Sequence, residues 1–354
     1  MQSLCSKQSS DRNGRPRRHA PLISVIVPAH NCARFIGAAL DSLITQKVQD
    51  IEVITVDDAS TDSTATIALE YCSLDPRFRL IRRRTPSGRP AIPRNEGLRE
   101  ARGHYIAFLD ADDVALPTRF ESTLKAMTEC DATLAFADML RFDNVSGIRD
   151  AQTRLQKAGF VERAAPYLER VNESTYRCTP NFIAYMLAET CTINTQTVLF
   201  ARSLLDDEAI WFDETLICAE DTDLFYRLAS HSQIAYLNEE QTLYRVRNDS
   251  LTAARPEGTA LDAITVRRVN LERYHSRLSQ AEICRAREKI AVALTEVGYG
   301  RWCDGRKREA RAAYLESWKT VRSAGALKGY LKAFINRAHV VTALRWPRHA
   351  LRLD

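Results

Sequence analysis

The amino-acid sequence predicts an α/β fold, with helices on both faces of a central sheet and a helical region at the C-terminal end. The first observation is an alternation of strand and helix patterns from residue 21 onward. The second is that the strand segments are continuous apolar runs, which is typical of parallel strands buried on both faces. The third is a change to helical and basic patterning from about residue 260.

The first half of the chain supplies four strand patterns and three helix patterns. Short β-branched runs predict the strands, and apolar residues three and four positions apart predict the helices. We expect strands over 21–31, 51–60, 78–83 and 104–110, and helices over 31–43, 64–72 and 93–102, with Gly103 stopping the last helix.

The second half is less regular, and residues 144–180 are polar without a readable pattern. We expect helices over 118–128 and 219–230, strands over 132–143 and 193–202, and a strand pair over 234–246. Residues 286–335 have the helix–turn–helix rhythm of a single tetratricopeptide-like pair, which is too little for a repeat array.

The 354 residues are enough for one large domain or two smaller ones. We divide the chain into a disordered basic leader (1–20), a sheet domain (21–255) and a helical, basic C-terminal region (256–354). The composition, 45% hydrophobic and 27% charged, is that of a globular protein. Apolar runs are too short for a transmembrane helix, and the leader precedes no apolar core, so a secretory signal is not expected either.

The cysteines and the charges bear on the cellular compartment of the protein and on its partners. Nine cysteines are scattered singly without a CxxC pair, which indicates reduced thiols in a cytosol and argues against zinc. Residues 1–20 carry five basic residues and one acidic residue, and residues 321–354 carry seven and one. Such ends could lie against an anionic membrane surface or could be solvated tails. No nucleic-acid-binding motif accompanies them, so nucleic acid is not expected as a partner.

Three acids, Asp110, Asp112 and Asp113, follow the fourth strand in the segment FLDADD. Unpaired carboxylates are costly to bury, so a strand that ends this way needs an explanation. The alternate carboxylates of Asp-x-Asp project to one side. They suit Mg²⁺ or Mn²⁺, because such ions take one or two carboxylates and complete their shell with substrate phosphates. The other interpretation is an acidic start to the next helix, with Asp113 and Pro117 near its first turn.

Three further segments also allow two interpretations each. In VDDAST, Asp57 can accept hydrogen bonds from a base or ribose, or the segment can be a helix N-cap formed by Asp58, Ser60 or Thr61. Glu220 and Asp221, in AEDTDL, can supply a general base kept ionised by a helix N-terminus, or can merely complement the helix dipole. Arg245 and Arg247, in YRVRNDS, can grip a pyrophosphate or an acidic acceptor, or can be surface residues.

Taken together, these segments carry a family resemblance. Between residues 22 and 252 the chain contains, in this order, SVIVPAHN, VDDASTD, PRNEGLREARGHYIAFLDADD, AEDTDLFYRL and YRVRNDS. In that arrangement the chain resembles the family-2 glycosyltransferases, which are inverting enzymes of the nucleotide-sugar-binding GT-A fold. The resemblance implies a Rossmann-like mixed sheet with helices on both faces, followed here by the helical C-terminal region.

The resemblance also implies which residues bind a nucleotide-sugar donor. The first loop would wrap the base, the acid after the second strand would contact it, and the PRNEG segment would lie on the nucleotide side. The residues implied are Pro28, Ala29, His30, Asn31, Asp57, Arg94, Asp110 and Ala111. His30 stands where the family commonly has an aromatic residue, and the segment RPAIPRNEG carries two prolines where small residues are usual.

By the same resemblance, Asp112 and Asp110 would hold Mn²⁺ or Mg²⁺. Asp221 matches the catalytic base, with Glu220 as its neighbour and the second choice for that role. The base would take a proton from an acceptor hydroxyl, and a single in-line displacement would invert the anomeric configuration.

The QxxRW pattern of processive polysaccharide synthases is absent, so we expect a hexosyl- or hexosaminyltransferase that adds one sugar. The expected donor is a UDP- or other nucleotide-sugar, and the acceptor a saccharide or lipid-linked saccharide of exopolysaccharide, capsule or lipopolysaccharide biosynthesis. The expected location is the cytoplasm, at the periphery of the inner face of the plasma membrane. Two alternatives stay open, a nucleotidyltransferase and an inactive GT-A binding or scaffold protein. SVIVPAHN lacks the glycine-rich phosphate loop of the former, and the intact acids argue against the latter.

Overall fold

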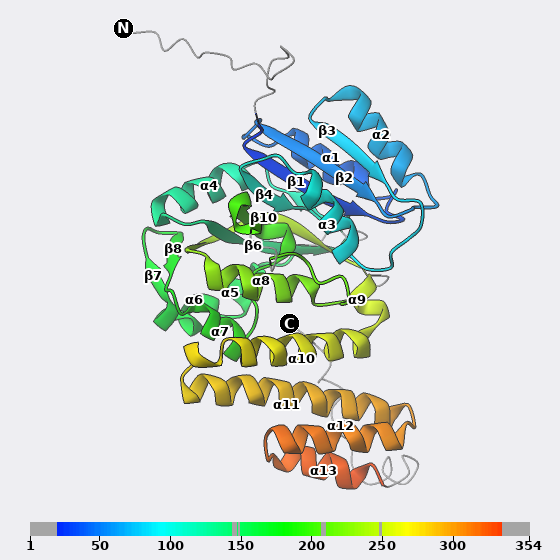
Figure 1. Cartoon of the computed structure of the whole chain (residues 1–354), viewed down its shortest axis with the longest axis vertical. Helices are drawn as coiled ribbons and strands as arrows, with labels where there is room; N and C mark the ends of the chain where they lie inside the picture. The colour runs from blue at the N-terminus through cyan, green and yellow to red at the C-terminus, as the bar shows by residue number, and fades with distance from the viewer. Residues whose placement is uncertain (1–19, 144–146, 148, 207–209, 248–249, 335–354) are drawn as a thin grey trace.

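The computed structural model describes residues 20–143, 147, 149–206, 210–247 and 250–334. A sheet covered by helices forms one end of the molecule, and helices α10–α13, stacked on one another, form the other end (Figure 1). The strands found in the described residues form one sheet: β1 (Ile23–Ala29), β2 (Ile51–Asp57), β3 (Phe78–Arg82), β4 (Tyr105–Phe108), β5 (Val114–Ala115), β6 (Leu134–Asp143), β7 (Leu168–Arg170), β8 (Thr175–Cys178), β9 (Val198–Ala201) and β10 (Ile234–Val246).

The sheet is mixed, because strands from the second half of the chain insert among those of the first half. Its order is β3-β2-β1-β4-β9-β6-β10-β8-β7, with β5 paired to β10. Strands β1 to β4 are parallel to one another. Strand β9 runs antiparallel to β4 and β6, whereas β10 runs parallel to β6 and antiparallel to β8. The carboxyl ends of β1, β2 and β4 therefore meet at one edge, where ligands bind in open α/β sheets.

Helices cover both faces of the sheet and continue beyond it. They are α1 (Ile36–Ile44), α2 (Thr64–Leu74), α3 (Ala91–Glu100), α4 (Arg119–Cys130), α5 (Arg154–Lys157), α6 (Phe160–Arg163), α7 (Phe182–Ala188), α8 (Glu220–His231), α9 (Leu251–Ala254), α10 (Pro256–Arg273), α11 (Gln280–Cys303), α12 (Lys307–Thr320) and α13 (Ala324–Lys332). Short 3-10 turns lie at Ala165–Tyr167, Thr195–Thr197, Arg202–Asp206 and His275–Arg277.

Alternate residues of β1 enter two separate apolar cores. Val25 belongs to the core shared with α1, α2 and α4, whereas Ile26 belongs to the core shared with α3, α7 and α8. Because both faces are buried, a one-residue slip of β1 would exchange the two sets of side chains, so its register is strongly specified. This fixes where the strand ends, and therefore where the first loop begins.

The strands and helices predicted for the first half are confirmed, with shifted boundaries. The first helix begins at Ile36 rather than at residue 31, and the third is α3, which ends at Glu100. In the second half, the predicted strand over 193–202 is reduced to β9, because residues 195–197 form a 3-10 turn.

The predicted strand pair over 234–246 is wrong. Residues Ile234–Val246 form the single strand β10, whose pairing with β6 shifts register between Leu237 and Glu240 and again between Glu240 and Thr242. The polar residues at its centre therefore form a bulge, which bends a strand without ending it.

In the C-terminal region, α11 and α12 form the predicted helix pair, and Tyr314 of α12 packs against Gly298 of α11 and Gly329 of α13. Among the described residues, no helix combines the length and the apolar character needed to cross a bilayer. The predicted leader, apart from Ala20, lies outside the described residues.

Candidate active site

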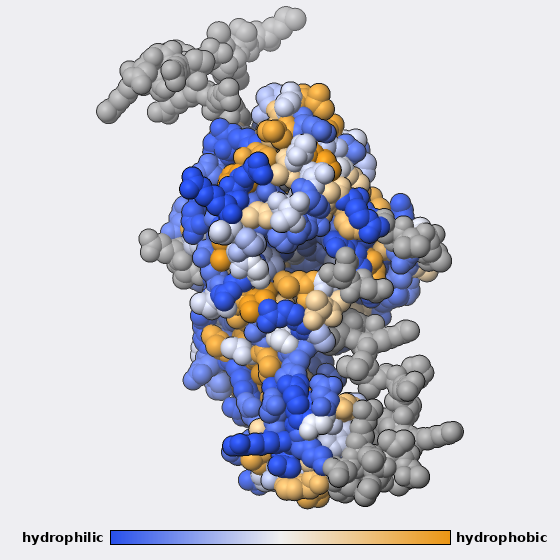
Figure 2. Space-filling model, turned by 90° about the vertical axis from the view of Figure 1, so that its right-hand side faces the viewer, coloured by the Kyte–Doolittle hydropathy of each residue, from blue (hydrophilic) through white to orange (hydrophobic). Residues whose placement is uncertain are grey.

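The acids predicted from the sequence lie at one edge of the sheet. Asp57 is the last residue of β2, and Asp110 follows the last residue of β4 by two positions. Strand β1 pairs with both strands and ends at Ala29. Figure 2 views the molecule from the side toward which these strands run and shows the surface hollowed between the sheet and the helices below it.

The first loop is tied to the loop after β2. His30 lies with Nδ1 2.7 Å from the carbonyl oxygen of Asp58, so Nδ1 carries the proton in this bond. The backbone N–H of Asn31 donates to Ser60 Oγ (2.9 Å), and Thr61 N–H donates to Asn31 Oδ1 (2.8 Å). Asn31 adopts a left-handed conformation (φ 49°), which asparagine tolerates better than most residues.

Of the four residues predicted to form the nucleotide-binding loop, two lie in β1 and two lie beyond it. Pro28 and Ala29 are the last two residues of β1, and His30 and Asn31 are the exposed ones. Ala111, also predicted at the nucleotide, has its side chain buried in the core shared with α1 and α4. Only the backbone of Ala111 is therefore left to face a ligand.

In the described residues, one carboxylate oxygen of Asp57 has no hydrogen-bond partner, whereas both carboxylate oxygens of its neighbour Asp58 have one. Asp57 is fully buried, and its Oδ1 accepts a hydrogen bond from Ser60 N–H (3.3 Å). Its Oδ2 has no hydrogen-bond partner in the described residues, although Arg82 Nε lies 3.9 Å away. Asp58 is occupied by Arg83 (2.7 Å) and by the hydroxyl of Ser87 (2.7 Å). An unsatisfied buried carboxylate oxygen is costly, and a donor group on a ligand would remove that cost.

The two carboxylates of Asp-x-Asp each face an arginine. Asp110 Oδ1 accepts from Arg94 Nη2 (2.8 Å), and Asp112 Oδ2 accepts from Arg247 Nη1 (2.9 Å). Both side chains stay partly exposed, at 28% and 27%. Burial and the charge of Asp110 raise the pKa of Asp112, against the opposing charge of Arg247. The two acids therefore lie close enough to interact electrostatically, and each already has an arginine partner.

Asp113 does not start the next helix, so that interpretation is wrong. Helix α4 begins at Arg119, after Pro117, and β5 lies between it and Asp113. Asp113 is buried, and its Oδ1 accepts from the backbone N–H of Arg245 on β10 (2.8 Å). Burial, with the charges of Asp110 and Asp112 adding to it, raises the pKa of Asp113 well above its usual value. Asp113 joins the end of β4 to the end of β10.

Arg94 and Glu220 form a buried ion pair that the sequence did not indicate. Arg94 Nη1 donates to Glu220 Oε1 (2.5 Å), while Nη2 of the same guanidinium donates to Asp110. Burial opposes the charge of Arg94, but Asp110, Glu220 and Asp221 outweigh it and raise the pKa of the guanidinium. Burial also raises the pKa of Glu220, with Arg94 lowering it and Asp221 raising it further.

Asp221, the predicted base, stands in the first turn of α8 and is partly exposed. Its Oδ1 accepts from the N–H of Thr222 (2.6 Å), and among the described residues it makes no ion pair. A general base has to be within reach of the hydroxyl whose proton it takes, and the partial exposure of Asp221 meets this requirement. Of the two acids that open α8, Glu220 is held by an arginine and Asp221 is not.

Two participants were not predicted as such. Phe35, which falls within the helix predicted over 31–43, lies under the guanidinium groups of Arg245 (4.8 Å) and Arg247 (4.7 Å). Arg119 is buried at the end of β4, where its Nη2 donates to the carbonyl oxygen of Phe108 (2.9 Å) and burial lowers its pKa to about 9. No local sequence signal identifies either role, because each depends on residues that are distant in the chain.

The carboxylates fit a divalent ion of the hard-ligand type. Across the part of the chain that the structure describes, no three His, Cys, Asp or Glu side chains form a metal-binding cluster. Mg²⁺ and Mn²⁺ sites of this kind do not need one, because substrate phosphates and water complete the shell. Asp112 and Asp110 would supply two oxygen ligands at a partly exposed edge, and Arg247 would have to share Asp112 with the ion.

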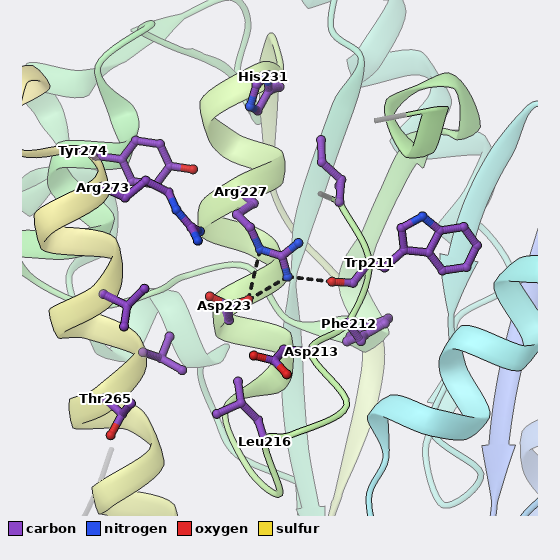
Figure 3. A pocket seen from close by; sticks show the side chains of 13 residues that line it. Trp211, Phe212, Asp213, Leu216, Asp223, Arg227, His231, Thr265, Arg273 and Tyr274 are labelled. Atoms are coloured by element: carbon purple, nitrogen blue, oxygen red, sulfur yellow. Dashed lines mark hydrogen bonds and ion pairs between the residues drawn. The ribbon is translucent and has the colours of Figure 1, made fainter. Parts of the chain in front are cut away.

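A separate cavity of about 550 Å³ lies behind the site, between α8, α10 and residues 210–216 (Figure 3). On its wall, Arg227 donates to Asp223 Oδ2 (2.6 Å) and to the carbonyl oxygen of Trp211 (2.6 Å). Phe212 lines the cavity and also packs against the guanidinium of Arg94 (5.5 Å). None of the predicted site residues lines this cavity, so it is distinct from the predicted site.

The family model for glycosyl transferase family 2 matches residues 24–199, which run from β1 into β9. This part of the chain is a family 2 glycosyltransferase domain. The curated relatives agree with this assignment. EpsJ of Bacillus subtilis, an uncharacterized glycosyltransferase, is 29% identical over 66% of this chain and 63% of its own. TuaG of Bacillus subtilis, a putative teichuronic acid biosynthesis glycosyltransferase, is 37% identical over 33% of this chain and 46% of its own.

Solved structures show that the glycosyltransferase fold continues past the family match. Residues 1–349 of Staphylococcus aureus TarS, in complex with UDP-GlcNAc, superpose with a TM-score of 0.60 at 20% identity, covering 88% of this chain and 90% of TarS 1–349. The mannosyltransferase PcManGT from Pyrobaculum calidifontis, in complex with GDP-Man and Mn²⁺, gives 0.52 at 17% identity, covering 90% and 88%. This chain spans 30% to 63% of the length of the first three curated relatives. The fold is GT-A with a helical C-terminal region.

Proposed function

We propose that this protein transfers one sugar from a nucleotide-diphosphate sugar to a saccharide or lipid-linked acceptor, with inversion at the anomeric carbon. The observation that carries the proposal is the gathering of Asp57, Asp110, Asp112 and Asp221 at one edge of the sheet. They come from three separate segments of the chain, and Arg94 links two of these segments directly. The family match of residues 24–199 supports the same activity.

The donor would bind with its base at Asp57 and the exposed residues His30 and Asn31. The spare Oδ2 of Asp57 is suited to accept a hydrogen bond from a base N–H group. UDP is the first nucleotide to test, because the TarS complex contains UDP-GlcNAc, and GDP is the second, because the PcManGT complex contains GDP-Man.

Asp112 and Asp110 would hold Mn²⁺ or Mg²⁺ next to the diphosphate. When bound, such an ion would offset the negative charge that develops on the leaving diphosphate. Arg247, which donates to Asp112, would lie beside the diphosphate, and guanidinium groups bind phosphate oxygens well.

Asp221 would act as the general base. Its carboxylate would take the proton of the acceptor hydroxyl as that oxygen attacks the anomeric carbon, and the bond from this carbon to the nucleoside diphosphate would break. Attack from the face opposite the leaving group inverts the configuration, so an α-linked donor gives a β-linked product.

The acceptor would belong to surface polysaccharide biosynthesis, by analogy with the relative named for teichuronic acid biosynthesis. A lipid-linked acceptor would place the enzyme in the cytoplasm, at the inner face of the plasma membrane. Helix α13 supports a membrane contact, because Leu327 and Leu331 are exposed one turn apart beside Lys328, and Phe334, just beyond the end of the helix, is exposed as well. Apolar residues flanked by lysines are typical of helices that lie on anionic bilayers.

A panel of nucleotide sugars tests the proposal, with Mn²⁺ present and with thermal stabilisation and donor hydrolysis as readouts. We expect one sugar nucleotide to stabilise the protein and to be hydrolysed slowly. Asp221→Asn should keep nucleotide–Mn²⁺ affinity but lose transfer, whereas Asp112→Ala should lose both. Normal transfer by Asp221→Asn would show that the base is assigned wrongly.

A further inference from the structure

We infer that Arg94 and Glu220 are positioning residues, which hold the base Asp221 in place relative to Asp110. The inference rests on the proposed function for the roles of Asp221 and Asp110. It departs from the family resemblance at two points, because the resemblance puts Arg94 on the nucleotide and offers Glu220 as a second choice for the base.

The geometry is that of one guanidinium joining two parts of the site. Arg94 on α3 is 6% exposed and reaches Asp110, after β4, through Nη2 and Glu220, at the start of α8, through Nη1. Its remaining nitrogen, Nε, is buried and has no hydrogen-bond partner in the described residues. Because Arg94 is buried and both of its terminal nitrogens face carboxylates, little of its guanidinium is open to a nucleotide.

The start of α8 depends on this link. Ala219, which precedes the helix, has φ 59°, a left-handed conformation that is unfavourable for alanine. Alanine also offers no side-chain cap, so the first N–H groups of α8 lack the usual acceptor. A helix start without its own cap needs to be held by tertiary contacts, and the pairing of Glu220 with Arg94 is such a contact.

Arg94 is itself held on its other side. The ring of Phe212 packs against its guanidinium at 5.5 Å. The backbone of Phe212 is fixed by Asn95, which donates to its carbonyl oxygen (2.9 Å) and accepts from its N–H (3.1 Å). The neighbouring residues Arg94 and Asn95 on α3 thus anchor the segment that leads into α8.

This arrangement separates the two acids that open α8. Glu220 is 5% exposed and its carboxylate faces Arg94, so an acceptor hydroxyl would have to displace an ion pair to reach it. Asp221 is partly exposed and makes no ion pair among the described residues. Glu220 acts through Asp221 by fixing the helix that carries it.

The test compares Glu220→Ala, Glu220→Gln and Arg94→Lys with the parent protein in kcat, in affinity for UDP with Mn²⁺, and in hydrogen exchange of residues 216–224. We expect Glu220→Ala to lower kcat about 10²-fold, the cost of a displacement of about 1 Å, without changing UDP affinity. Glu220→Gln should recover most of this loss, because its amide oxygen can still accept from Arg94. Arg94→Lys should also lower kcat and leave UDP affinity unchanged, since one ammonium cannot bridge both carboxylates in the same way.

Glu257→Ala is the matched control, because Glu257 pairs with Arg301 and Arg306 in the helical region, away from the sheet edge. It should leave kcat and exchange at 216–224 unchanged. The inference is overturned if Glu220→Gln is as inactive as Asp221→Asn, which would make Glu220 the base. It is equally overturned if Arg94→Lys weakens UDP binding while keeping kcat. If the parent transfers no sugar at all, the proposed function fails, but hydrogen exchange of residues 216–224 still tests the positioning role. Faster exchange in Glu220→Ala than in the parent supports that role, and unchanged exchange refutes it.

Discussion

Gly103, in the connection from α3 to β4, lies against the backbone of β1, and replacing it by alanine should destabilise the protein. A Cβ atom at this position would lie 2.7 Å from the carbonyl carbon of Ile23 and 2.8 Å from Ser24 Oγ, and closer still to the backbone nitrogen of Ser24. Real Cβ atoms do not approach backbone this closely. The backbone of β1 cannot move away without opening its pairing with β4.

The cost follows from which atoms would have to move. Overpacking a core side chain costs 1–3 kcal/mol, and a clash with the backbone of a central strand belongs at the top of that range, at roughly 3 kcal/mol. The N–H of Gly103 also donates to Ser24 Oγ (2.8 Å), and the same displacement would stretch that bond.

Gly300 provides a matched substitution with the opposite sign. It lies inside α11, and a Cβ there would meet nothing within 4 Å. Alanine is favoured over glycine in a helix by about 1 kcal/mol, so Gly300→Ala should stabilise. The two alanine variants should therefore differ by about 4 kcal/mol.

Thermal and urea unfolding of the two variants and the parent measure this difference. For a chain of this size, 1 kcal/mol shifts Tm by roughly 2 °C, so Gly103→Ala should melt roughly 6 °C lower and Gly300→Ala roughly 2 °C higher. A Gly103→Ala protein that is as stable as the parent would refute the reasoning, because it would show that β1 yields at this point without cost.

Three further predictions concern pH, membranes and metal. Burial raises the pKa of Glu52, but hydrogen bonds from Arg102 and Ser24 and the charge of Arg102 outweigh it and keep this pKa below its usual 4.5. Ionised Glu52 therefore stabilises the folded protein at pH values above the pKa of this residue in the unfolded chain, and the stabilisation is lost as the pH falls through the lower pKa of the folded state. The midpoint of urea unfolding should consequently fall less steeply at acidic pH in Glu52→Gln than in the parent protein. Leu331→Asp should weaken sedimentation with anionic vesicles, whereas Val292→Asp, at a position equally exposed (58% and 57%), should not. Chelation with EDTA should abolish transfer, and Mn²⁺ should restore it; transfer that persists in EDTA would exclude the metal.

The half of the fold nearest the N-terminus was predictable because its strands are buried on both faces. Mostly apolar runs such as Ile51–Asp57, which is buried along its whole length, have few alternatives to a parallel strand, and an acid at the end of such a run marks the ligand edge. The prediction for strand β10 was wrong for the opposite reason. Its centre is polar, and a polar stretch inside an apolar pattern reads as a turn unless the partner strand that accommodates the bulge is known.

The acids of the candidate site were predictable, but their contacts were not. The acids could be identified because each follows a strand or opens a helix, which are local features. The partners of Arg94 could not, because Asp110 and Glu220 meet only after the sheet has formed. Asp113 was misread for the same reason, since its partner is a backbone N–H on β10.

The insertion of β10 between β6 and β8 has a consequence for how the protein is made. Until the ribosome has delivered residues 234–246, β5, β6 and β8 have no partner on that side, and their backbone groups are open to other chains. The family-matched residues 24–199 should therefore not form a stable unit when expressed alone. The nascent chain has to remain protected from aggregation until almost the whole sheet has been synthesised.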